Sequence, residues 1–327
     1  MTTLRWGILS TANIGRQVVP GIAAAERCSV DAVASRDPIR GREFAAELGI
    51  PRVHDSYEAL LADPDIDAIY NPLPNHLHLP WTLAAIRAGK HVLCEKPLAT
   101  SSEDAETMAR AADDAGVRLM EAFMYRLHPS WLGVRKLVAS GRIGRLVAVQ
   151  SWFSFYNDDP GNIRNIREFG GGALFDIGCY VINVSRMLFG AEPRRVEASI
   201  VRDPESGVDV TSSGLLVFDT GVASFICSTR AEPDQRVHIH GTNGRISIEI
   251  PFNMPSDRPT RIFLTAGGDA PINPATETIM FPAADAYTCE AAAFAAAVLD
   301  GGPLPTPIED AVANLRVIER LVAAAEG

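Results

Sequence analysis

The stretch that decides the fold is Leu4-Arg-Trp-Gly-Ile-Leu-Ser-Thr-Ala-Asn-Ile-Gly15, near the beginning of the sequence. Its apolar run, Leu4–Ser10, predicts a buried strand, and a helical pattern follows over Ile14–Ala25. Between them, Ser10-Thr11-Ala12-Asn13-Ile14-Gly15 stands where a G-x-G-x-x-G loop would turn from strand to helix. Such a loop needs small residues, because its backbone approaches a pyrophosphate at the N-terminus of the helix. The stretch therefore predicts a cofactor-binding loop, with an ordinary tight βα turn as the alternative.

Strands and helices continue to alternate up to Ala122, with linkers of a few residues. This alternation of strands and helices predicts right-handed crossovers and a parallel sheet. We therefore expect a doubly wound α/β Rossmann domain over residues 1–122. Its further strands are predicted at Val30–Ala34, Asp67–Asn71, His91–Cys94 and Val117–Ala122, and its further helices at Ile39–Leu48, Ser56–Ala62, His76–Ala88 and Ser101–Ala115.

The second part of the chain, residues 123–327, has runs of strands without helices between them. Turn sequences such as Asp219-Thr-Gly221 and Thr242-Asn-Gly244 separate these strands, which predicts hairpins and a mainly antiparallel, open sheet in an α+β domain. We expect one face of its sheet to be exposed and to need a cover, which predicts at least a dimer. Its strands are predicted at Leu146–Phe155, Arg195–Val201, Ser213–Phe218, Val222–Thr229, Val237–His240, Arg245–Ile250 and Arg261–Thr265, and its helices at Trp131–Ser140, Ala173–Phe189, 285–299 and 307–325.

Composition excludes several classes of protein. The 327 residues carry a formal net charge of -10, which argues against a nucleic-acid partner. The longest purely apolar run, Ala291–Leu299, is far shorter than the ~20 residues that span a bilayer, so we expect no membrane partner. The five cysteines are scattered without a Cys-x-x-Cys pair. We therefore expect no disulfide framework, no structural metal and a cytoplasmic location.

The tip of the second strand bears on the choice of cofactor. A fold that prefers NAD places an acidic residue there, whereas this chain has Ser35-Arg36-Asp37. A hydroxyl and a guanidinium suit a 2′-phosphate, so Ser35 and Arg36 predict NADP as the cofactor, with NAD possible. The alternative interpretation makes Arg36 a solvated loop charge and Asp37 a helix cap.

Two further strand ends carry candidate residues, because ligands of open α/β sheets lie beyond the C-terminal ends of the strands. Glu95-Lys96-Pro97 follows one strand, and its lysine is well placed to meet a substrate hydroxyl. Asn71-Pro72-Leu73-Pro74-Asn75-His76-Leu77-His78 follows the neighbouring strand and could form a wall of the cofactor site. His76 and His78 do not share a helical face, so a metal site there is not expected.

A second constellation lies in the second domain. Gly170-Gly-Gly172 precedes the predicted helix that contains Asp176 and Tyr180. Four residues separate the two side chains, which places them on one face of an α-helix. A carboxylate beside a phenol can handle protons if that face lines a cleft. The alternative is an exposed aspartate next to a tyrosine of the core.

Taken together, these motifs resemble the glucose–fructose oxidoreductase and inositol dehydrogenase family of NAD(P)-dependent oxidoreductases. The resemblance extends over nearly the whole chain, through Asn71–His78, Ala88–Pro97, Glu121–Pro129 and Gly170–Tyr180. Tyr180 is more like the branch of dihydrodiol and xylose-type dehydrogenases, since many members have histidine there. The weak glycine fingerprint departs from the family pattern.

The resemblance implies hydride transfer between a nicotinamide and the carbinol carbon of a sugar, polyol or diol. It implies that Lys96 and Tyr180 move the proton and that Asp176 orients the substrate, with the choice between Lys96 and Tyr180 left open. It also implies that residues 123–327 bind the substrate and form a homodimer or homotetramer. Cofactor contacts would come from Ser10, Thr11, Ala12, Asn13, Ile14, Ser35, Arg36, Pro72, Leu73, Asn75, His78, Glu95, Lys96 and Arg126.

Two other functions are compatible with such a chain. An NAD-dependent glycosidase would use the same fold for transient oxidation and elimination, usually with a different constellation in the second domain. A non-catalytic NAD(P)-binding sensor would use the fold for binding alone. The presence of Lys96, Asp176 and Tyr180 together favours the dehydrogenase.

Overall fold

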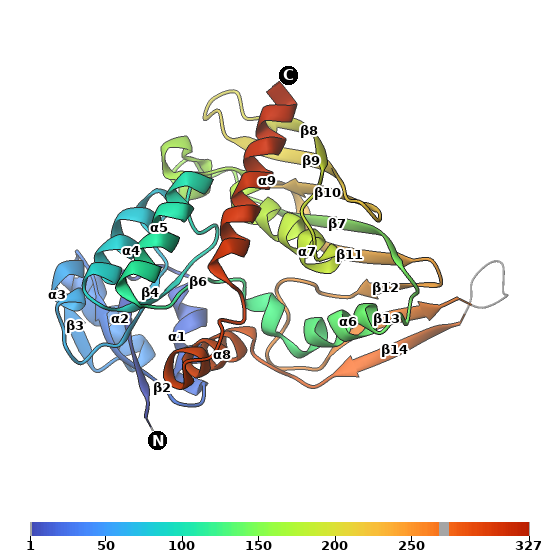
Figure 1. Cartoon of the computed structure of the whole chain (residues 1–327). Coiled ribbons are helices and arrows are strands. Elements are labelled where there is room, and N and C mark those ends of the chain that lie inside the picture. Colours follow the sequence, from blue (N-terminus) through green and yellow to red (C-terminus); the bar gives the residue numbers. More distant parts are fainter. Residues whose placement is uncertain (1, 268–274, 327) are drawn as a thin grey trace. The chain divides into compact units, whose positions relative to one another are not determined.

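The computed structural model describes residues 2–267 and 275–326, which form two compact units (Figure 1). The first unit consists of Met1–Leu127 and Asp285–Val312, and the second of His128–Ala284 and Ala313–Gly327. The contacts thus group helix α8 (Ala286–Asp300) with the N-terminal part of the chain. The single domain boundary near residue 122 stays a prediction.

The first unit is built on a six-stranded parallel sheet with the order β3-β2-β1-β4-β5-β6. This is the doubly wound Rossmann order that the sequence predicted. The sequence analysis missed β3, because its three residues, Arg52–His54, are too few for an apolar pattern. The strands are β1 (Leu4–Leu9), β2 (Cys28–Ala34), β3 (Arg52–His54), β4 (Ala68–Asn71), β5 (His91–Cys94) and β6 (Leu119–Glu121).

The helices of this unit begin and end at residues that suit those positions. The Asp37 carboxylate accepts hydrogen bonds from the N–H groups of Ile39 and Arg40 and so caps α2, with Pro38 in its first turn and Gly49 in the left-handed conformation at its end. The helices are α1 (Gly15–Ala24), α2 (Pro38–Leu48), α3 (Tyr57–Leu61), η1 (Asn75–Leu77), α4 (His78–Arg87), α5 (Ser102–Ala115) and η2 (Met124–Leu127).

Helix α8 completes the core of the first unit. Its Phe294 is fully buried and packs against Trp6 of β1, with 5.3 Å between ring centroids. Ala291 and Ala295 belong to the same buried cluster. The apolar run that is too short for a membrane is therefore a helix that covers the Rossmann sheet.

The second unit is built on an eight-stranded sheet with the order β14-β13-β12-β11-β7-β10-β9-β8. All its neighbouring pairs are antiparallel except β7 with β10, so the prediction of a mainly antiparallel sheet is confirmed. The sequence analysis missed β14. The strands are β7 (Leu146–Tyr156), β8 (Arg195–Arg202), β9 (Asp209–Val217), β10 (Val222–Ser228), β11 (Arg230–Gly241), β12 (Gly244–Ile248), β13 (Thr260–Ala266) and β14 (Thr276–Phe281).

Alternate side chains of this sheet differ in burial. In β10, Ala223, Phe225 and Cys227 are buried, whereas Val222, Ser224 and Ile226 are exposed or half-buried. The sheet is accompanied by α6 (Pro129–Ala139), η3 (Ile163–Asn165), η4 (Arg167–Phe169), η5 (Leu174–Gly178), α7 (Cys179–Phe189) and α9 (Ile308–Glu326).

One helical segment of the described residues, Arg167–Phe189, is long and apolar enough to cross a bilayer by length and composition. Its most apolar window is 72% buried inside the structure, as in a core helix.

Candidate active site

The loop between β1 and α1 has the backbone of a phosphate-binding turn. Ser10 adopts a left-handed conformation with φ 74°, although it is not glycine, and its Oγ accepts a hydrogen bond from the N–H of Ala12 at 3.3 Å. Gly15 keeps the packing role of the last glycine, because a Cβ there would lie 2.8 Å from Cζ of Phe44. These small residues before a helix N-terminus fit the pyrophosphate of a dinucleotide.

The tip of β2 brings Ser35 and Arg36 next to α3. Ser35 is buried, and its Oγ accepts a hydrogen bond from the N–H of Asp37 at 3.1 Å. Arg36 is exposed, and its Cζ lies 6.0 Å from the ring centroid of Tyr57. Burial raises the pKa of the Tyr57 phenol, although the nearby Arg36 guanidinium and the Ser10 hydroxyl oppose this shift. Tyr57, which the sequence analysis missed, thus links the phosphate loop to the arginine.

The loop after β4 is held by His78, which is fully buried. Its Nδ1 lies 2.8 Å from the carbonyl oxygen of Pro97, and its Nε2 lies 2.6 Å from that of Leu73. Burial lowers the pKa of His78 to about 4, so the neutral ring has one N–H to share between the two carbonyls. Any effect of His78 on a cofactor must therefore pass through the two loops that it joins.

Glu95 and Lys96 follow β5 directly. The hydroxyl of Tyr70, at the end of β4, donates a 2.6 Å hydrogen bond to Oε1 of Glu95. Burial and the Glu95 charge raise the pKa of Tyr70 well above its ordinary value, so this phenol stays protonated and donates. Lys96 is half-buried and precedes a cis peptide bond to Pro97. The structure therefore supports Glu95 from the neighbouring strand and places Lys96 at the C-terminal edge of the sheet.

A buried carboxyl of α8 lies behind this edge. Glu290 is 2% exposed, and its Oε1 has no hydrogen-bond partner among the described residues. Burial raises the pKa of Glu290 well above its ordinary value, and the charge of Glu95 raises it further. Glu290 is therefore a neutral acid beside the Glu95–Tyr70 pair.

Arg126 lies in η2 and is also buried. It forms an ion pair with Asp310 in the first turn of α9. Its expected contact with the cofactor stays a prediction, as do those of Pro72 and Asn75 in the loop after β4.

In the second unit, Asp176 and Tyr180 do not belong to one regular α-helix. Asp176 lies in the π-helical turn η5, and Tyr180 lies in the first turn of α7. The predicted helical segment Ala173–Phe189 is present over those bounds, but Leu174–Gly178 is a π-turn instead of α-helix. A π-turn contains more residues than an α-turn, so four residues stop just short of one turn, and the expected common face of Asp176 and Tyr180 stays a prediction. Nε of Arg164 donates to Oδ2 of Asp176 at 2.7 Å.

Aromatic rings fix the position of Tyr180. Its ring centroid lies 5.6 Å from that of Phe153 on β7 and 5.3 Å from that of Phe252. Phe153 and Phe252 stack on each other at 4.9 Å. Tyr180 itself is 6% exposed, so its ring belongs to the core and its position is set by packing.

Each unit thus assembles its own set of the predicted residues. The first unit gathers the phosphate loop, the arginine at the tip of β2 and Lys96 along the C-terminal edge of one sheet, and the second places Asp176 and Tyr180 on consecutive turns. Joint action of Lys96 and Tyr180 on one substrate stays a prediction. Tyr57, Tyr70, Arg164 and Glu290 carry no motif of their own, so their roles became visible only in three dimensions.

Comparison with known families identifies both parts of the chain. Residues 4–123 match the oxidoreductase family with an NAD-binding Rossmann fold, and residues 131–247 match the GFO/IDH/MocA C-terminal domain. The chain belongs to the GFO/IDH/MocA family of oxidoreductases. The resemblance that the sequence motifs indicated is confirmed, and the GFO/IDH/MocA assignment makes the protein an NAD(P)-binding enzyme.

Individual relatives come from the branch that Tyr180 suggested. A D-xylose 1-dehydrogenase (NADP(+)) of Haloferax volcanii is 40% identical, with 99% of this chain and 98% of the relative covered. The trans-1,2-dihydrobenzene-1,2-diol dehydrogenase of Mus musculus is 35% identical, with 75% and 74% covered. The 3-ketoreductase KijD10 of Actinomadura kijaniata, solved in complex with NADP and TDP-benzene, has a TM-score of 0.91 and 31% identity, with 99% and 98% covered.

Proposed function

We propose that the protein is an NADP-dependent dehydrogenase or reductase that acts on a secondary or hemiacetal CH–OH group of a sugar or diol. The observation that carries the proposal is the half-buried Lys96 directly after β5, next to a Glu95 that Tyr70 supports. The xylose and dihydrodiol dehydrogenases among the relatives support the substrate class, and Ser35 and Arg36 at the tip of β2 support NADP.

In this mechanism the nicotinamide, when bound, takes up or returns the hydride. Lys96 and Tyr180 hold the reacting hydroxyl, and one of them takes its proton during oxidation or returns it during reduction. Asp176, kept in place by Arg164, binds a second hydroxyl and so orients the substrate. The loop Ser10–Ile14 would hold the pyrophosphate at the N-terminus of α1, and Ser35 and Arg36 would hold the 2′-phosphate.

The experiment is an assay of absorbance at 340 nm with NADP and a panel of D-xylose, D-glucose and trans-1,2-dihydrobenzene-1,2-diol. We expect turnover of at least one of them, and none of a chromogenic glycoside. Cleavage of the glycoside would favour the glycosidase instead. NADP binding without any turnover would favour the sensor.

Variants of the two proton-handling residues test their roles. Lys96→Met removes the charge while it keeps much of the length, and Tyr180→Phe removes only the hydroxyl. We expect each to lower turnover by roughly 10²-fold or more, with cofactor affinity little changed, because general acid–base catalysis contributes that much. The double variant should lose much less than the product of both factors, since the two residues serve one proton transfer. Near-normal turnover in both single variants would remove them from the mechanism.

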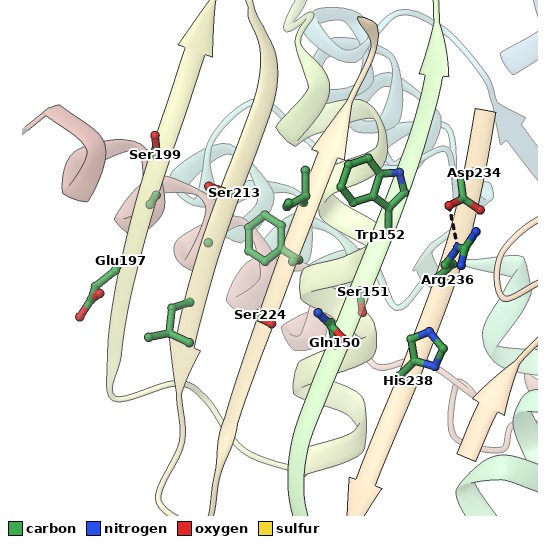
Figure 2. Close-up of a pocket in the computed structure, with 15 residues that line it drawn as sticks. Gln150, Ser151, Trp152, Glu197, Ser199, Ser213, Ser224, Asp234, Arg236 and His238 are labelled. Atoms are coloured by element: carbon green, nitrogen blue, oxygen red, sulfur yellow. Dashed lines mark hydrogen bonds and ion pairs between the residues drawn. The ribbon is translucent and has the colours of Figure 1, made fainter. Parts of the chain in front are cut away.

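We also propose that the enzyme is at least a dimer, formed through the exposed face of the second sheet. Two rows of side chains cross five neighbouring strands on this face (Figure 2). They border a hollow of about 750 Å³. One row is Ser199, Ser213, Ile226, Trp152 and Arg236, and the other is Glu197, Leu215, Ser224, Gln150 and His238. The cytoplasmic location stays a prediction.

A further inference from the structure

Gly172, which precedes η5, has no room for a side chain. Gly172 has a φ of 118°, a conformation that other residues rarely adopt. A Cβ on Gly172 would lie only 2.0 Å from Oδ1 of Asp209, on β9. Its N–H donates to the carbonyl oxygen of Arg164 at 2.8 Å. The backbone at Gly172 therefore packs closely against the Asp209 carboxylate and is hydrogen-bonded to the loop that carries Arg164.

Asp209 is a buried acceptor at the start of this helical segment. It is 6% exposed, and its Oδ2 accepts hydrogen bonds from the N–H of Leu174 at 2.7 Å and from Oγ of Ser212 at 2.9 Å. The first N–H groups of a helix lack partners within the helix, so a carboxylate from another element can fix where the helix begins. Asp209 thus sets the position of the first residue of the π-turn.

The position of Asp176, a residue of the proposed mechanism, depends on Leu174, which Asp209 anchors. Asp176 lies two positions after Leu174, and its N–H donates to the carbonyl oxygen of Gly172 at 3.1 Å. Its carboxylate pairs with Arg164, whose own carbonyl holds Gly172. The next turn carries Tyr180. A shift of the backbone at Gly172 and Leu174 would therefore move both Asp176 and its ion pair.

We propose that Asp209 is a positioning residue for the reaction, which holds the π-turn so that Asp176 meets the substrate next to Tyr180. This inference rests on the proposed function, because it assigns those two residues to the substrate. Asp209 itself does not touch the substrate. Its contribution is the hydrogen-bond acceptor at Leu174, rather than a charge at the reacting centre.

The test compares Asp209→Ala with Asp209→Asn in the full chain, using NADP and the best substrate of the panel above. Asparagine keeps an oxygen acceptor for the Leu174 N–H, whereas alanine removes it. We expect alanine to lower kcat/KM by roughly 10- to 100-fold, as for a catalytic group displaced by about an ångström. We expect Asp209→Asn to retain most of the kcat/KM that Asp209→Ala loses. Gly172→Ala, whose Cβ would displace the same carboxylate, should match the alanine variant.

Two further measurements distinguish a loss of positioning from a general loss of folded structure. NADPH affinity, measured by fluorescence, should be unchanged in all three variants, because the cofactor residues lie in the other unit. Amide hydrogen exchange of the peptide 170–180 should accelerate in Asp209→Ala and stay near normal in Asp209→Asn. The exposed Asp219→Ala, in the turn between β9 and β10, serves as the control with normal turnover and exchange.

The inference is overturned if Asp209→Ala keeps normal kcat/KM and normal exchange, or if asparagine is as damaging as alanine. Loss of NADPH affinity in step with turnover would also overturn it. Failure of the proposed function looks different. In that case Asp176→Asn and Tyr180→Phe have no effect on turnover, while the exchange at 170–180 still responds to Asp209→Ala.

Discussion

Arg36 is the residue on which discrimination between the two cofactors depends. It is exposed at the tip of β2, and the ring of Tyr57 lies beneath its guanidinium. Asp37 is occupied as the cap of α2, through hydrogen bonds from two N–H groups, so it is not oriented toward a ribose hydroxyl as the acidic residue of an NAD-specific site would be. Both sequence interpretations therefore hold in part, since Asp37 does cap a helix while Arg36 stays next to the cofactor loop.

Arg36→Ala should weaken NADP binding far more than NAD binding. A hydrogen bond to a charged group contributes about 1.5–3 kcal/mol, which corresponds to roughly ten- to hundredfold in Kd. NAD lacks the 2′-phosphate and should lose little. The measurement is the Kd of each cofactor by fluorescence titration, in low and in high salt, because salt weakens an exposed charge contact.

The matched control is Arg42→Ala, which removes the same charge from an exposed position of α2. It should leave the ratio of the two affinities unchanged. Equal affinities for NADP and NAD in the unmodified protein would contradict the assignment, as would an equal loss of both in Arg36→Ala.

Helix α8 combines buried apolar side chains with a buried carboxyl group. It closes the core of the first unit with Phe294 and Ala295, yet it also buries Glu290, whose Oε1 has no hydrogen-bond partner within residues 2–267 and 275–326. Burial and the neighbouring Glu95 raise the pKa of Glu290, so the folded protein keeps a proton that the unfolded chain releases above about pH 4.3. Because the folded state binds more protons in that range, stability falls as the pH rises toward the folded pKa.

Glu290→Gln should remove this pH dependence. The glutamine side chain keeps the shape of the neutral acid and cannot release a proton. The difference in free energy of unfolding between Glu290→Gln and the parent should therefore shift in favour of glutamine as pH rises from 5 to 8, by at most about 1.4 kcal/mol per pH unit. Urea denaturation at several pH values measures it. The exposed Glu26→Gln should give a constant difference, and a constant difference for Glu290→Gln as well would contradict a neutral Glu290.

The elements also show what the sequence could and could not reveal. A continuous apolar run located β1, which is buried along almost its whole length, and apolar periodicity located α5 and the long strands. Arg52–His54 offered three residues and no pattern, so β3 could not be found. Periodicity also could not separate a π-turn from an α-turn over the five residues Leu174–Gly178.

The candidate site likewise contains residues that the sequence could indicate and residues that it could not. Lys96, Asp176 and Tyr180 could be proposed from the sequence because they lie in motifs that resemble a known family, and their roles stay predictions. The residues around them were not, because Tyr57, Arg164 and Glu290 owe their roles to neighbours far away in the chain. His78 was expected beside the cofactor from its place in a motif; it is fully buried and joins two loops, and its contact with the cofactor stays a prediction.

For the whole molecule, the exposed face of the second sheet is the surface through which we expect the protein to assemble. Its eight strands are 5 to 12 residues long, and at about 3.3 Å per residue and 4.8 Å between strands they span roughly 1,000 Å². This is about the area that each partner contributes to a standard protein interface. Ile226 and Trp152 are neighbours in one row, and Leu215 follows Glu197 in the other. Glu197 and Arg236 lie at ends of the rows (Figure 2). The face thus mixes three apolar side chains with polar ones, and interfaces between separately folded proteins are as a whole about as apolar as the rest of the surface.

We therefore expect a dimer at micromolar concentration in sedimentation velocity, and expect Ile226→Lys to dissociate it. Ile226 pairs with Trp152 in the middle of the face, so a lysine there would bury an unpaired charge in the interface, at a cost of several kcal/mol. Ile39→Lys is the matched control, because Ile39 is 62% exposed on α2 of the other unit and should leave the dimer intact. The Ile226→Lys monomer should still bind NADPH normally, since the cofactor residues belong to the first unit. A parent protein that sediments as a monomer would refute the dimer outright, and an Ile226→Lys variant that stays dimeric would place the interface elsewhere.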